Sequence, residues 1–382
     1  MYPLLYEIVN ATTLLFMKRF FFLLLLCSFF SCHKKENTHS LISSIFTRNV
    51  TELIQEVNQL KALVASDAKL STIQNQFLLS RNSYKKLEWM CEYYYPTVSK
   101  SINGPAIPEF EENDGITVPP EGFQVIEEFL FPKYDVATKS DLEMEIGVLR
   151  SNLKRLQKVS EKTTLADTYI FDALRLSIFR MITLGITGFD SPVALHSIPE
   201  AKVVLESIAE NVTFYKNTLD AKSFQALSAT LSQGTKYLAT HTNFNAFDRA
   251  YFIKNIANPL SKQLYQCQKS ASIPFVKETR ALKTTAQTLF DKNAFDIEAF
   301  NGFPDYKTTP EKIALGKKLF NDPILSGNNS RSCASCHHSD IAFTDGLEQT
   351  ISLDGKTKVK RNTPTLMNIA FQRAFFYDSK VS

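Results

Sequence analysis

The sequence predicts an all-α fold, and three observations support this prediction. Gly is rare, with 12 residues against 30 Phe in a chain of 382, and long tracts rich in Leu, Lys, Glu and Ala favour helices over a turn-rich β-fold. Apolar residues recur three and four positions apart through much of the chain, which is the spacing of one helix face. Sustained alternation of apolar and polar residues, the pattern of a strand, is not found.

The overall composition is that of an ordinary globular protein, with 44% hydrophobic and 21% charged residues. A length of 382 residues is enough for two or three domains. The formal net charge of +4 is small, and Lys and Arg do not form the clustered stripes that a nucleic-acid-binding surface needs. Nucleic acid is therefore not expected as a partner.

The N-terminus has the features of a bacterial export signal. Met17, the predicted true start, is followed by Lys18 and Arg19 and then by a largely apolar run over 20–31 that is too short to span a bilayer comfortably. The Phe-Ser-Cys that ends this run resembles a lipobox, in which Cys32 is lipidated and becomes the mature N-terminus. An uncleaved anchor and cleavage without lipidation are the alternatives.

The export signal is thus assigned to residues 1–32, and residues 33–43, which begin with the polar run "HKKENTHS", to a short tether. The expected location is the periplasmic side of a bacterial cell membrane, where the lipid holds the protein. The sequence does not distinguish the inner from the outer membrane.

Residues 44–300 are predicted to form a helical bundle. Its first helix is indicated by apolar residues on one face: Val50, Leu53, Ile54, Val57, Leu60 and Leu63. A second helical run stops at Pro96. "SDLE" at 140–143 predicts a capping box, with Ser140 as N-cap, for a helix that ends near Glu161. Further helices are expected over 164–190, 198–217, 222–239, 244–268 and 274–291.

The helical pattern breaks near residue 300, and a domain boundary is placed at about 295–305. Thr309 then predicts an N-cap, and Pro310 the first residue of a new helix. Residues 301–382 are therefore treated as a separate domain.

Several conspicuous side chains of the bundle are assigned to packing. Cys91 and Cys267 are predicted to be buried free thiols rather than a disulfide. His196 and His241 stand alone and are not predicted as ligands. Trp89, together with the tyrosines at 93–95, is interpreted as helix packing.

"GFQVIE", from Gly122 to Glu127, matches a Gly-x-His-x-x-Glu motif except that Gln124 replaces the histidine. With the surrounding sequence, this run resembles helical-bundle proteins of the imelysin type. Because an amide is a poor metal ligand, the resemblance implies the bundle shape but not the metal site. Glu127 and Glu128 are predicted to lie on a solvated helix face.

The run from Cys333 to His337, "CASCH", has the Cys-x-x-Cys-His spacing of c-type haem attachment. Residues three apart on a helical turn point to one side, so both thiols can form thioethers with the vinyl groups of one porphyrin. The histidine that follows can then bind the iron as proximal ligand. Export agrees with this interpretation, because haem of this type is attached outside the cytoplasm.

This run has three alternatives to haem attachment. A thiol redox pair would need a βα context, whereas a polar loop precedes Cys333. A zinc site would need a second pair of ligands, and none follows. A chance match is the third alternative. His338 is predicted to face solvent rather than iron.

"LGKKLFNDPILSGNNSRSCASCHHSDIAFTDG" and "RNTPTLMNIAFQRAFFYDSK" extend the motif from about Leu315 to Lys380. These stretches resemble the bacterial di-haem cytochrome c peroxidase family, which includes the MauG-type proteins. The resemblance implies that residues 301–382 are an incomplete first haem domain. The expected architecture is then an N-terminal helical bundle followed by a partial c-type cytochrome domain.

The resemblance also implies roles for five residues. Cys333 and Cys336 would attach haem c, and His337 would be the proximal iron ligand of the haem that reacts with hydrogen peroxide. Arg361 would lie near the haem and balance propionate charge. Asn362 matches an asparagine that helps to bind calcium between the two haem domains, and an amide oxygen suits that cation. No residue is assigned as catalytic.

Three features depart from the family pattern. Leu353 stands where many members have a distal histidine, so the distal face of the haem is expected to be open. Tyr377 replaces a tryptophan that lies between the two haems in the family. The chain ends at Ser382, before the family's distal glutamate and second haem domain, so one haem is expected here instead of two.

The resemblance implies an oxidoreductase that reduces hydrogen peroxide with electrons from a reduced cytochrome c or a similar donor. The alternative is a monohaem electron-transfer or redox-sensing lipoprotein with a helical partner-binding domain. The expected partners are hydrogen peroxide, a small donor cytochrome or cupredoxin, the membrane through the lipid anchor only, and a second copy of the chain.

Overall fold

The computed structural model describes residues 37–111, 116–302, 304–372 and 375. By its contacts the chain divides into Met1–Leu41 and Ile42–Ser382, and each unit is considered by itself. The predicted export signal, with Met17 and Cys32, lies outside the described residues, as do Tyr377 and the chain end. The domain boundary predicted at about 295–305 stays a prediction.

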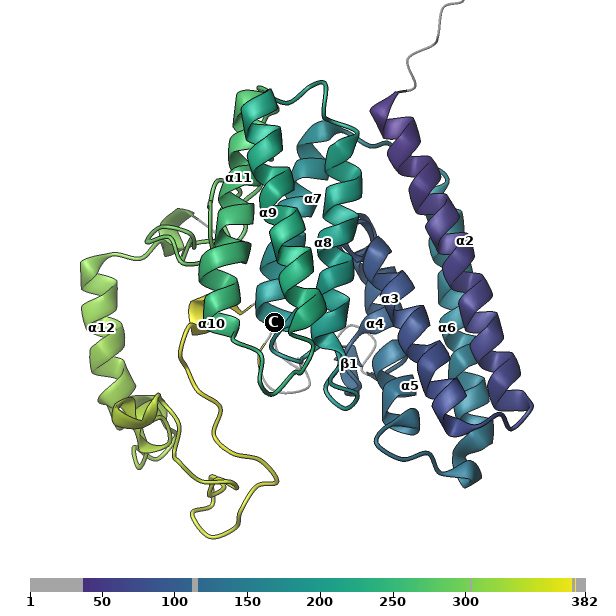
Figure 1. Ribbon diagram of the computed structural model, residues 1–382. Helices are drawn as coiled ribbons and strands as arrows, with labels where there is room; N and C mark the ends of the chain where they lie inside the picture. The colour runs from purple at the N-terminus through teal and green to yellow at the C-terminus, as the bar shows by residue number, and fades with distance from the viewer. Residues whose placement is uncertain (1–36, 112–115, 303, 373–374, 376–382) are drawn as a thin grey trace, which may run out of the picture. The chain divides into compact units, whose positions relative to one another are not determined.

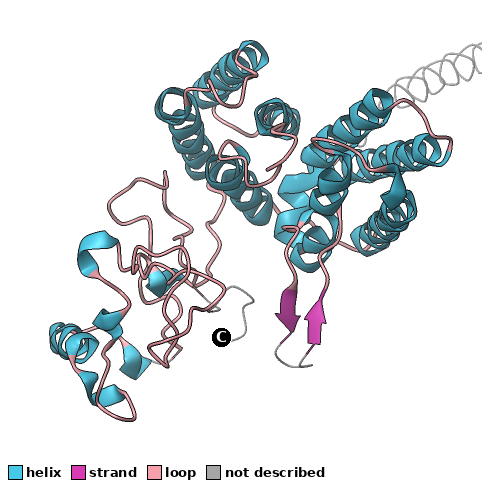
Figure 2. Cartoon of the chain, turned by 90° about the horizontal axis from the view of Figure 1, so that it is seen from below, coloured by secondary structure: helices cyan, strands magenta, loops and turns pink. Residues whose placement is uncertain are grey.

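The described chain is mostly helical, and the predicted all-α fold is confirmed (Figure 1). Its α-helices are α2 (Thr38–Ala65), α3 (Leu70–Tyr94), α4 (Pro96–Asn103), α5 (Phe123–Leu130), α6 (Lys139–Ser160), α7 (Asp167–Arg180), α8 (Ser197–Thr213), α9 (Ala221–Thr240), α10 (Arg249–Phe252), α11 (Asn258–Ser270) and α12 (Pro310–Asn321). Two π-helical turns, Met181–Gly185 and Ile253–Ala257, continue α7 and α10. A short antiparallel hairpin pairs β1 (Glu109–Glu111) with β2 (Ile116–Val118), as Figure 2 shows.

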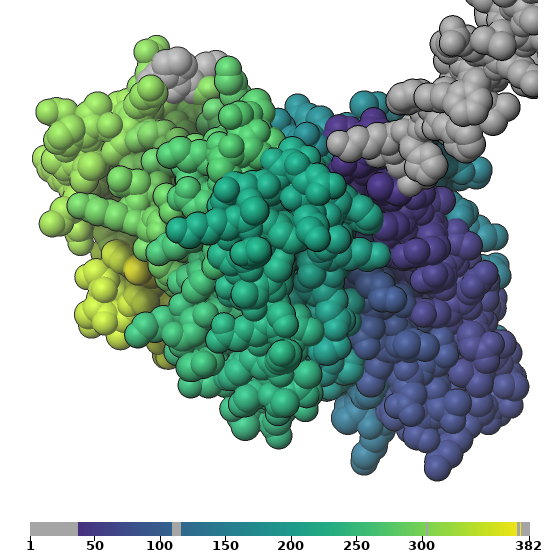
Figure 3. Space-filling view, turned by 45° about the horizontal axis from the view of Figure 1, so that its top comes forward, coloured from purple at the N-terminus to yellow at the C-terminus, as the bar shows by residue number. Residues whose placement is uncertain are grey.

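The core lies between the helices from α2 to α11, where α3 packs against α8, α8 against α9, and α9 against α11. In Figure 3, side chains fill the spaces that separate these ribbons in Figure 1. Helix α2 buries Val50, Leu53, Val57 and Leu60 completely, which confirms the predicted apolar face. Each buried side chain of this size contributes about 1.5–3 kcal/mol, so the apolar stripe is the main force that holds the helix in place.

Two predicted helix starts have different outcomes. Thr309 caps α12 by accepting a hydrogen bond from the Lys312 backbone N–H, as predicted. The predicted N-cap at Ser140 is wrong, because α6 already begins at Lys139. A 3₁₀ turn over Val136–Thr138 precedes it, and the Asp135 side chain caps that turn. Ser140 therefore lies inside the first turn of the helix.

The helix predicted over 274–291 is absent, and the chain there forms turns and loops. Arg175 of α7 reaches into this segment and donates hydrogen bonds to the carbonyl oxygens of Thr284 (2.7 Å) and Ala286 (2.5 Å). Arg280 in the same segment forms two 2.7 Å hydrogen bonds with the Asp172 carboxylate. In a helix, the carbonyl groups of Thr284 and Ala286 would accept hydrogen bonds from the helix backbone. Here they accept hydrogen bonds from the Arg175 side chain instead.

Arg175 is buried, no carboxylate of the described residues forms an ion pair with it, and burial lowers its pKa to about 10. We expect Arg175→Leu to destabilise the segment over 280–290, because each carbonyl left buried and unpaired costs about 1–3 kcal/mol. Hydrogen exchange should accelerate in this segment, and urea denaturation should measure the loss. Arg48→Leu is the control, since Arg48 is exposed, its ion pairs are 3.7 Å long, and its hydrogen bonds with Asn49 are 3.3 and 3.4 Å long. Equal effects of the two substitutions would contradict this prediction.

Candidate functional site

The first cysteine begins a 3₁₀ turn, Cys333–Ser335. The second, Cys336, follows this turn directly as its C-cap residue. The Cys333 carbonyl accepts hydrogen bonds from the backbone N–H groups of Cys336 (3.2 Å) and His337 (3.0 Å), which closes the turn. Both thiols are free, with Cys333 exposed and Cys336 half-buried. Two reduced thiols on one turn suit the formation of two thioether bonds to one flat group.

His337 follows this turn and is half-buried. Its Nδ1 lies 2.8 Å from the backbone carbonyl oxygen of Phe343. Because a carbonyl oxygen only accepts hydrogen bonds, Nδ1 carries the proton of the neutral ring and Nε2 keeps its lone pair. This arrangement, a histidine fixed through one nitrogen by a carbonyl, is usual for metal-binding imidazoles.

The other side chains of the run behave differently. His338 is exposed, as predicted, and its Nε2 lies 3.3 Å from the Ser335 carbonyl oxygen. Among the described residues, no group of three or more His, Cys, Asp or Glu side chains is placed to hold a metal ion.

Residues 304–372 contain very little buried surface. Of the described residues in this range, Thr363 alone is buried, at 4% exposure. Helix α12 contacts the turn at Cys333–Ser335, and Phe320 of α12 meets the Phe343 ring edge-on at 5.8 Å. Large apolar side chains remain exposed, among them Leu325 and Leu353. A broad apolar group such as a porphyrin could cover surface of this kind.

The predicted calcium ligand Asn362 lines a surface hollow with Thr344, Gly346, Leu347 and Glu348. Carboxylate and amide carbonyl oxygens are ligands that calcium prefers. Asn362 and Glu348, 14 positions apart in the sequence, line the same hollow and have side chains of these two kinds.

The two remaining predicted positions lie on the surface. Arg361 is exposed, and its backbone carbonyl accepts a 3.0 Å hydrogen bond from Thr350. Leu353 is 84% exposed. The roles predicted for Arg361 at the haem propionates and for Leu353 at an open distal face remain predictions.

The prediction that Glu127 lies on a solvated face is wrong, because its side chain is fully buried. Its Oε1 accepts 2.8 Å hydrogen bonds from the backbone N–H groups of Val193 and Ala194, and its Oε2 lies 3.9 Å from Nη1 of Arg81. Glu128, one residue later, is exposed as predicted. Gln124 is also buried and donates to the Asn103 carbonyl oxygen at 3.2 Å.

Glu127 belongs to a buried ionic network that sequence analysis did not find. Arg81 binds Glu200 at 2.5 Å, and Lys85 binds Asp190 at 2.9 Å. Glu88, Glu92 and Arg180 extend the network toward the surface. These groups come from α3, α5, α7, α8 and the loop that precedes α8, so no local sequence signal joins them.

Burial raises the pKa of Glu127, even though Arg81 lies beside it. The folded state then favours the protonated carboxyl, so this group stabilises the fold less as pH rises from its usual value of 4.5 through the raised one. We expect Glu127→Gln to remove this pH-dependent contribution to the free energy of unfolding. The parent should therefore lose stability relative to the variant as pH rises from 4.5 through the raised pKa of Glu127.

Urea denaturation at a series of pH values measures this difference. Glu128→Gln removes an exposed carboxylate of the same helix and is the control. Parallel stability profiles for the parent and Glu127→Gln would contradict the expectation.

Cys91, Cys267 and Trp89 are buried, as predicted. Cys91 and Cys267 are buried free thiols, and burial raises the pKa of each. Trp89 is 5% exposed, and the Tyr93 hydroxyl donates to Asp172 at 3.0 Å.

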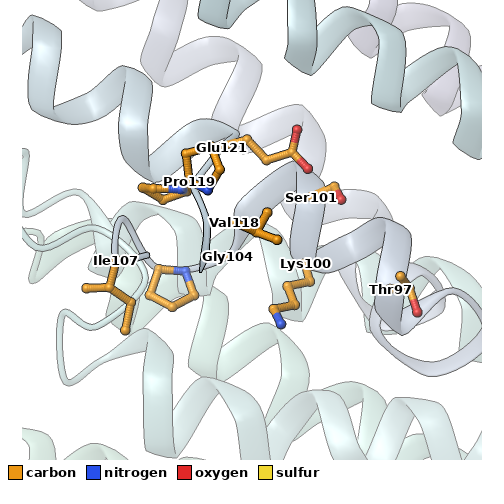
Figure 4. Close-up of a pocket in the computed structure, with 10 residues that line it drawn as sticks. Thr97, Lys100, Ser101, Gly104, Ile107, Val118, Pro119 and Glu121 are labelled. Carbon is orange, nitrogen blue, oxygen red and sulfur yellow. The ribbon is translucent and has the colours of Figure 1, made fainter. Parts of the chain in front are cut away.

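One pocket of the helical region is drawn in Figure 4. It lies between α4 and the segments on either side of the β-hairpin, where Lys100, Ile107, Val118 and Glu121 line it. None of its residues belongs to the predicted site. Across the described part of the chain, no helix is both long enough and apolar enough to cross a membrane.

Comparison with known proteins gives matches over the C-terminal part of the chain. Residues 310–382 match the family described as di-haem cytochrome c peroxidase. The methylamine utilization protein MauG of Methylorubrum extorquens is 44% identical over 72 residues, which are 19% of this chain and 20% of that protein. Cytochrome c551 peroxidase of Pseudomonas aeruginosa is 33% identical over 100 residues, which are 26% of this chain and 28% of that protein.

The resemblance of this C-terminal part to di-haem peroxidases and MauG is therefore confirmed. The chain spans 20% and 28% of the length of these two relatives. Among solved structures, an imelysin-like protein from Psychrobacter arcticum shares 16% identity, with a TM-score of 0.42, over 63% of this chain and 95% of that one.

Proposed function

We propose that this chain is a c-type haem oxidoreductase that reduces hydrogen peroxide. In this proposal Cys333 and Cys336 attach haem c, and His337 binds its iron. The observation that supports it best is the geometry of His337, which follows a turn with two free thiols and has its Nδ1 fixed 2.8 Å from the Phe343 carbonyl oxygen. The match of residues 310–382 to di-haem peroxidases supports the same assignment.

The chain's own residues have separate tasks in this proposal. A bound haem supplies an iron centre that exchanges electrons and reacts with peroxide. The two thiols would bind the porphyrin covalently, and His337, whose ring orientation is fixed, would bind the iron. Arg361 would balance propionate charge, and the exposed Leu353 supplies no histidine ligand at its point of the chain.

We also propose the partners and the location that the resemblance implies. Electrons would come from a small cytochrome or cupredoxin, on the periplasmic side of a bacterial membrane, with Cys32 lipidated and with a second copy of the chain as partner. The names of two relatives, cytochrome c551 peroxidase and cytochrome c peroxidase, support a cytochrome donor.

Expression of the full chain in bacteria that export c-type cytochromes and attach their haem tests the proposed function. We expect one haem per chain by absorption of the pyridine adduct, and consumption of hydrogen peroxide when a reduced donor cytochrome is present. Absence of covalent haem would overturn the proposal. Attached haem that is inert to peroxide would instead support the electron-transfer or redox-sensing alternative.

Asn362 is proposed as a calcium ligand together with Glu348. We expect Asn362→Ala to lower calcium affinity about tenfold or more, because a divalent site of few protein oxygens depends on each of them. Calorimetric titration with calcium measures this. Glu311→Gln, on α12 and outside the hollow, is the control for lost polar surface. Unchanged affinity in Asn362→Ala would exclude this assignment.

A further inference from the structure

We propose that the backbone of Ala342 and Phe343 is a positioning device for His337, an inference that rests on the proposed haem site. Both residues are in the left-handed region, with φ of 58° and 59°. Among the described residues, the other non-glycine positions with positive φ occur singly, and only these two are consecutive. Side chains with a Cβ avoid this region, and such strain gathers where function requires one backbone geometry.

The left-handed pair closes a small loop onto the histidine. The Phe343 N–H donates to the His338 carbonyl oxygen at 2.8 Å, and the His338 N–H donates to the Thr344 carbonyl oxygen at 2.9 Å. Between these bonds the Phe343 carbonyl oxygen accepts the 2.8 Å hydrogen bond from Nδ1 of His337. A change of φ at either residue of the pair would rotate this carbonyl away from the ring.

Two contacts from outside the loop hold the strained pair. The Thr365 hydroxyl donates to the Ala342 carbonyl oxygen at 2.5 Å. The Phe343 ring meets Phe320 of α12 edge-on, at 5.8 Å and 81°. These contacts come from both sides of the loop in the sequence, so the geometry of the pair depends on the assembled segment rather than on local preference.

The hydrogen bond at Nδ1 affects Nε2, the nitrogen of His337 that would bind the iron. An Nδ1–H that donates to a carbonyl fixes the tautomer and makes the imidazole a stronger electron donor. A stronger donor favours the ferric over the ferrous state of a bound haem, and so lowers its midpoint potential. Ala342 and Phe343 would therefore lower the midpoint potential of a bound haem without contacting its iron.

The test compares Ala342→Val, which disfavours the left-handed region, with Ala342→Gly, which favours it. Ser339→Val, at an exposed position outside the pair, controls for adding a β-branched side chain to this loop. The first readout is nitrogen NMR of the His337 ring in the haem-free chain. We expect the Nδ1–H tautomer in the parent, Ala342→Gly and Ser339→Val, and a mixture of tautomers in Ala342→Val.

The second readout uses the haem-loaded chain. Ala342→Val should shift the iron–histidine stretching band to lower wavenumber and the midpoint potential to a more positive value, whereas Ala342→Gly and Ser339→Val should match the parent. Thr365→Val removes one outside contact and should shift both quantities in the same direction by a smaller amount. This second route decides the matter if Ala342→Val does not fold.

The outcomes separate this inference from the proposed function. Parent-like tautomer, band and potential in both Ala342→Val and Thr365→Val would overturn the positioning role, even with haem attached. Failure of every variant and the parent to attach haem would overturn the proposed function, while the ring tautomers of the haem-free chains would still decide the role of the pair.

Discussion

Replacing Arg81 with leucine is expected to destabilise the helical region by about 3–5 kcal/mol, the usual cost of leaving buried charges without their partner. Arg81 is 1% exposed and binds Glu200 at 2.5 and 3.0 Å, Asn103 at 2.9 Å and the Asp190 carbonyl oxygen at 2.6 Å. Its loss would leave Glu200 and Glu127 buried with less compensating charge. The midpoint of urea denaturation, followed by circular dichroism, measures the effect.

The pH dependence gives this prediction a second readout. Burial alone would raise the pKa of Glu200, but Arg81 and Lys85 beside it hold that pKa below its usual value. A lowered pKa means that the carboxylate stabilises the fold above its unfolded value of about 4.5 and that this contribution is lost as pH falls. We therefore expect the difference between the parent and Arg81→Leu to shrink in acid.

Two further variants control the Arg81 experiment. Arg48→Leu removes an exposed arginine whose ion pairs are worth about 0–1 kcal/mol. The double variant Arg81→Met with Glu200→Met should lose less than the two single substitutions together, because it removes both charges of the pair. A loss for Arg81→Leu as small as that for Arg48→Leu would show that the network does not stabilise the fold.

Substitution of both Cys333 and Cys336 by alanine is expected to abolish covalent haem entirely. Each thiol supplies one thioether in the proposed site, so each single variant should keep one bond and the double variant none. Haem that stays with the chain after denaturation, seen by haem staining or by intact mass, measures this. Ala334→Ser changes the same turn without removing a thiol and should keep the full amount.

Retention of haem by the denatured double variant would contradict this assignment of the thiols. Loss of haem from Ala334→Ser as well would show that the turn, rather than its sulfur atoms, is what the substitutions disturb. Cys91 and Cys267 are buried in the helical region, so they offer no exposed thiol that could substitute for the missing pair.

What could be predicted from sequence depended on how far apart the interacting residues are. The apolar face of α2 and the Thr309 cap of α12 are set by neighbours within one or two turns, and both were predicted. The spacing of Cys333, Cys336 and His337 is equally local. Glu127 was assigned to solvent because its partners, Arg81 and the backbone at 193–194, lie 46 and more residues away in the sequence.

Two other features had no usable local signal. The segment over 274–291 has helical spacing. However, two of its carbonyl groups accept hydrogen bonds from the Arg175 side chain, which lies about 110 positions earlier in the sequence. The carbonyl that fixes His337 belongs to a backbone in the left-handed region. In a sequence, such a conformation is usually indicated by a glycine. Ala342 and Phe343 stand there instead, so neither pattern nor propensity indicated the turn.

The near absence of buried residues in 304–372 has a consequence for the proteolysis of the chain. Because Thr363 is the one described residue of this range that is buried, little apolar burial opposes opening of the segment. Under the proposed function, haem attachment and ordering of the segment would be one thermodynamic event, as for other small domains built around a bound group. A chain that misses its haem would stay open to proteases, so only copies that carry haem would persist.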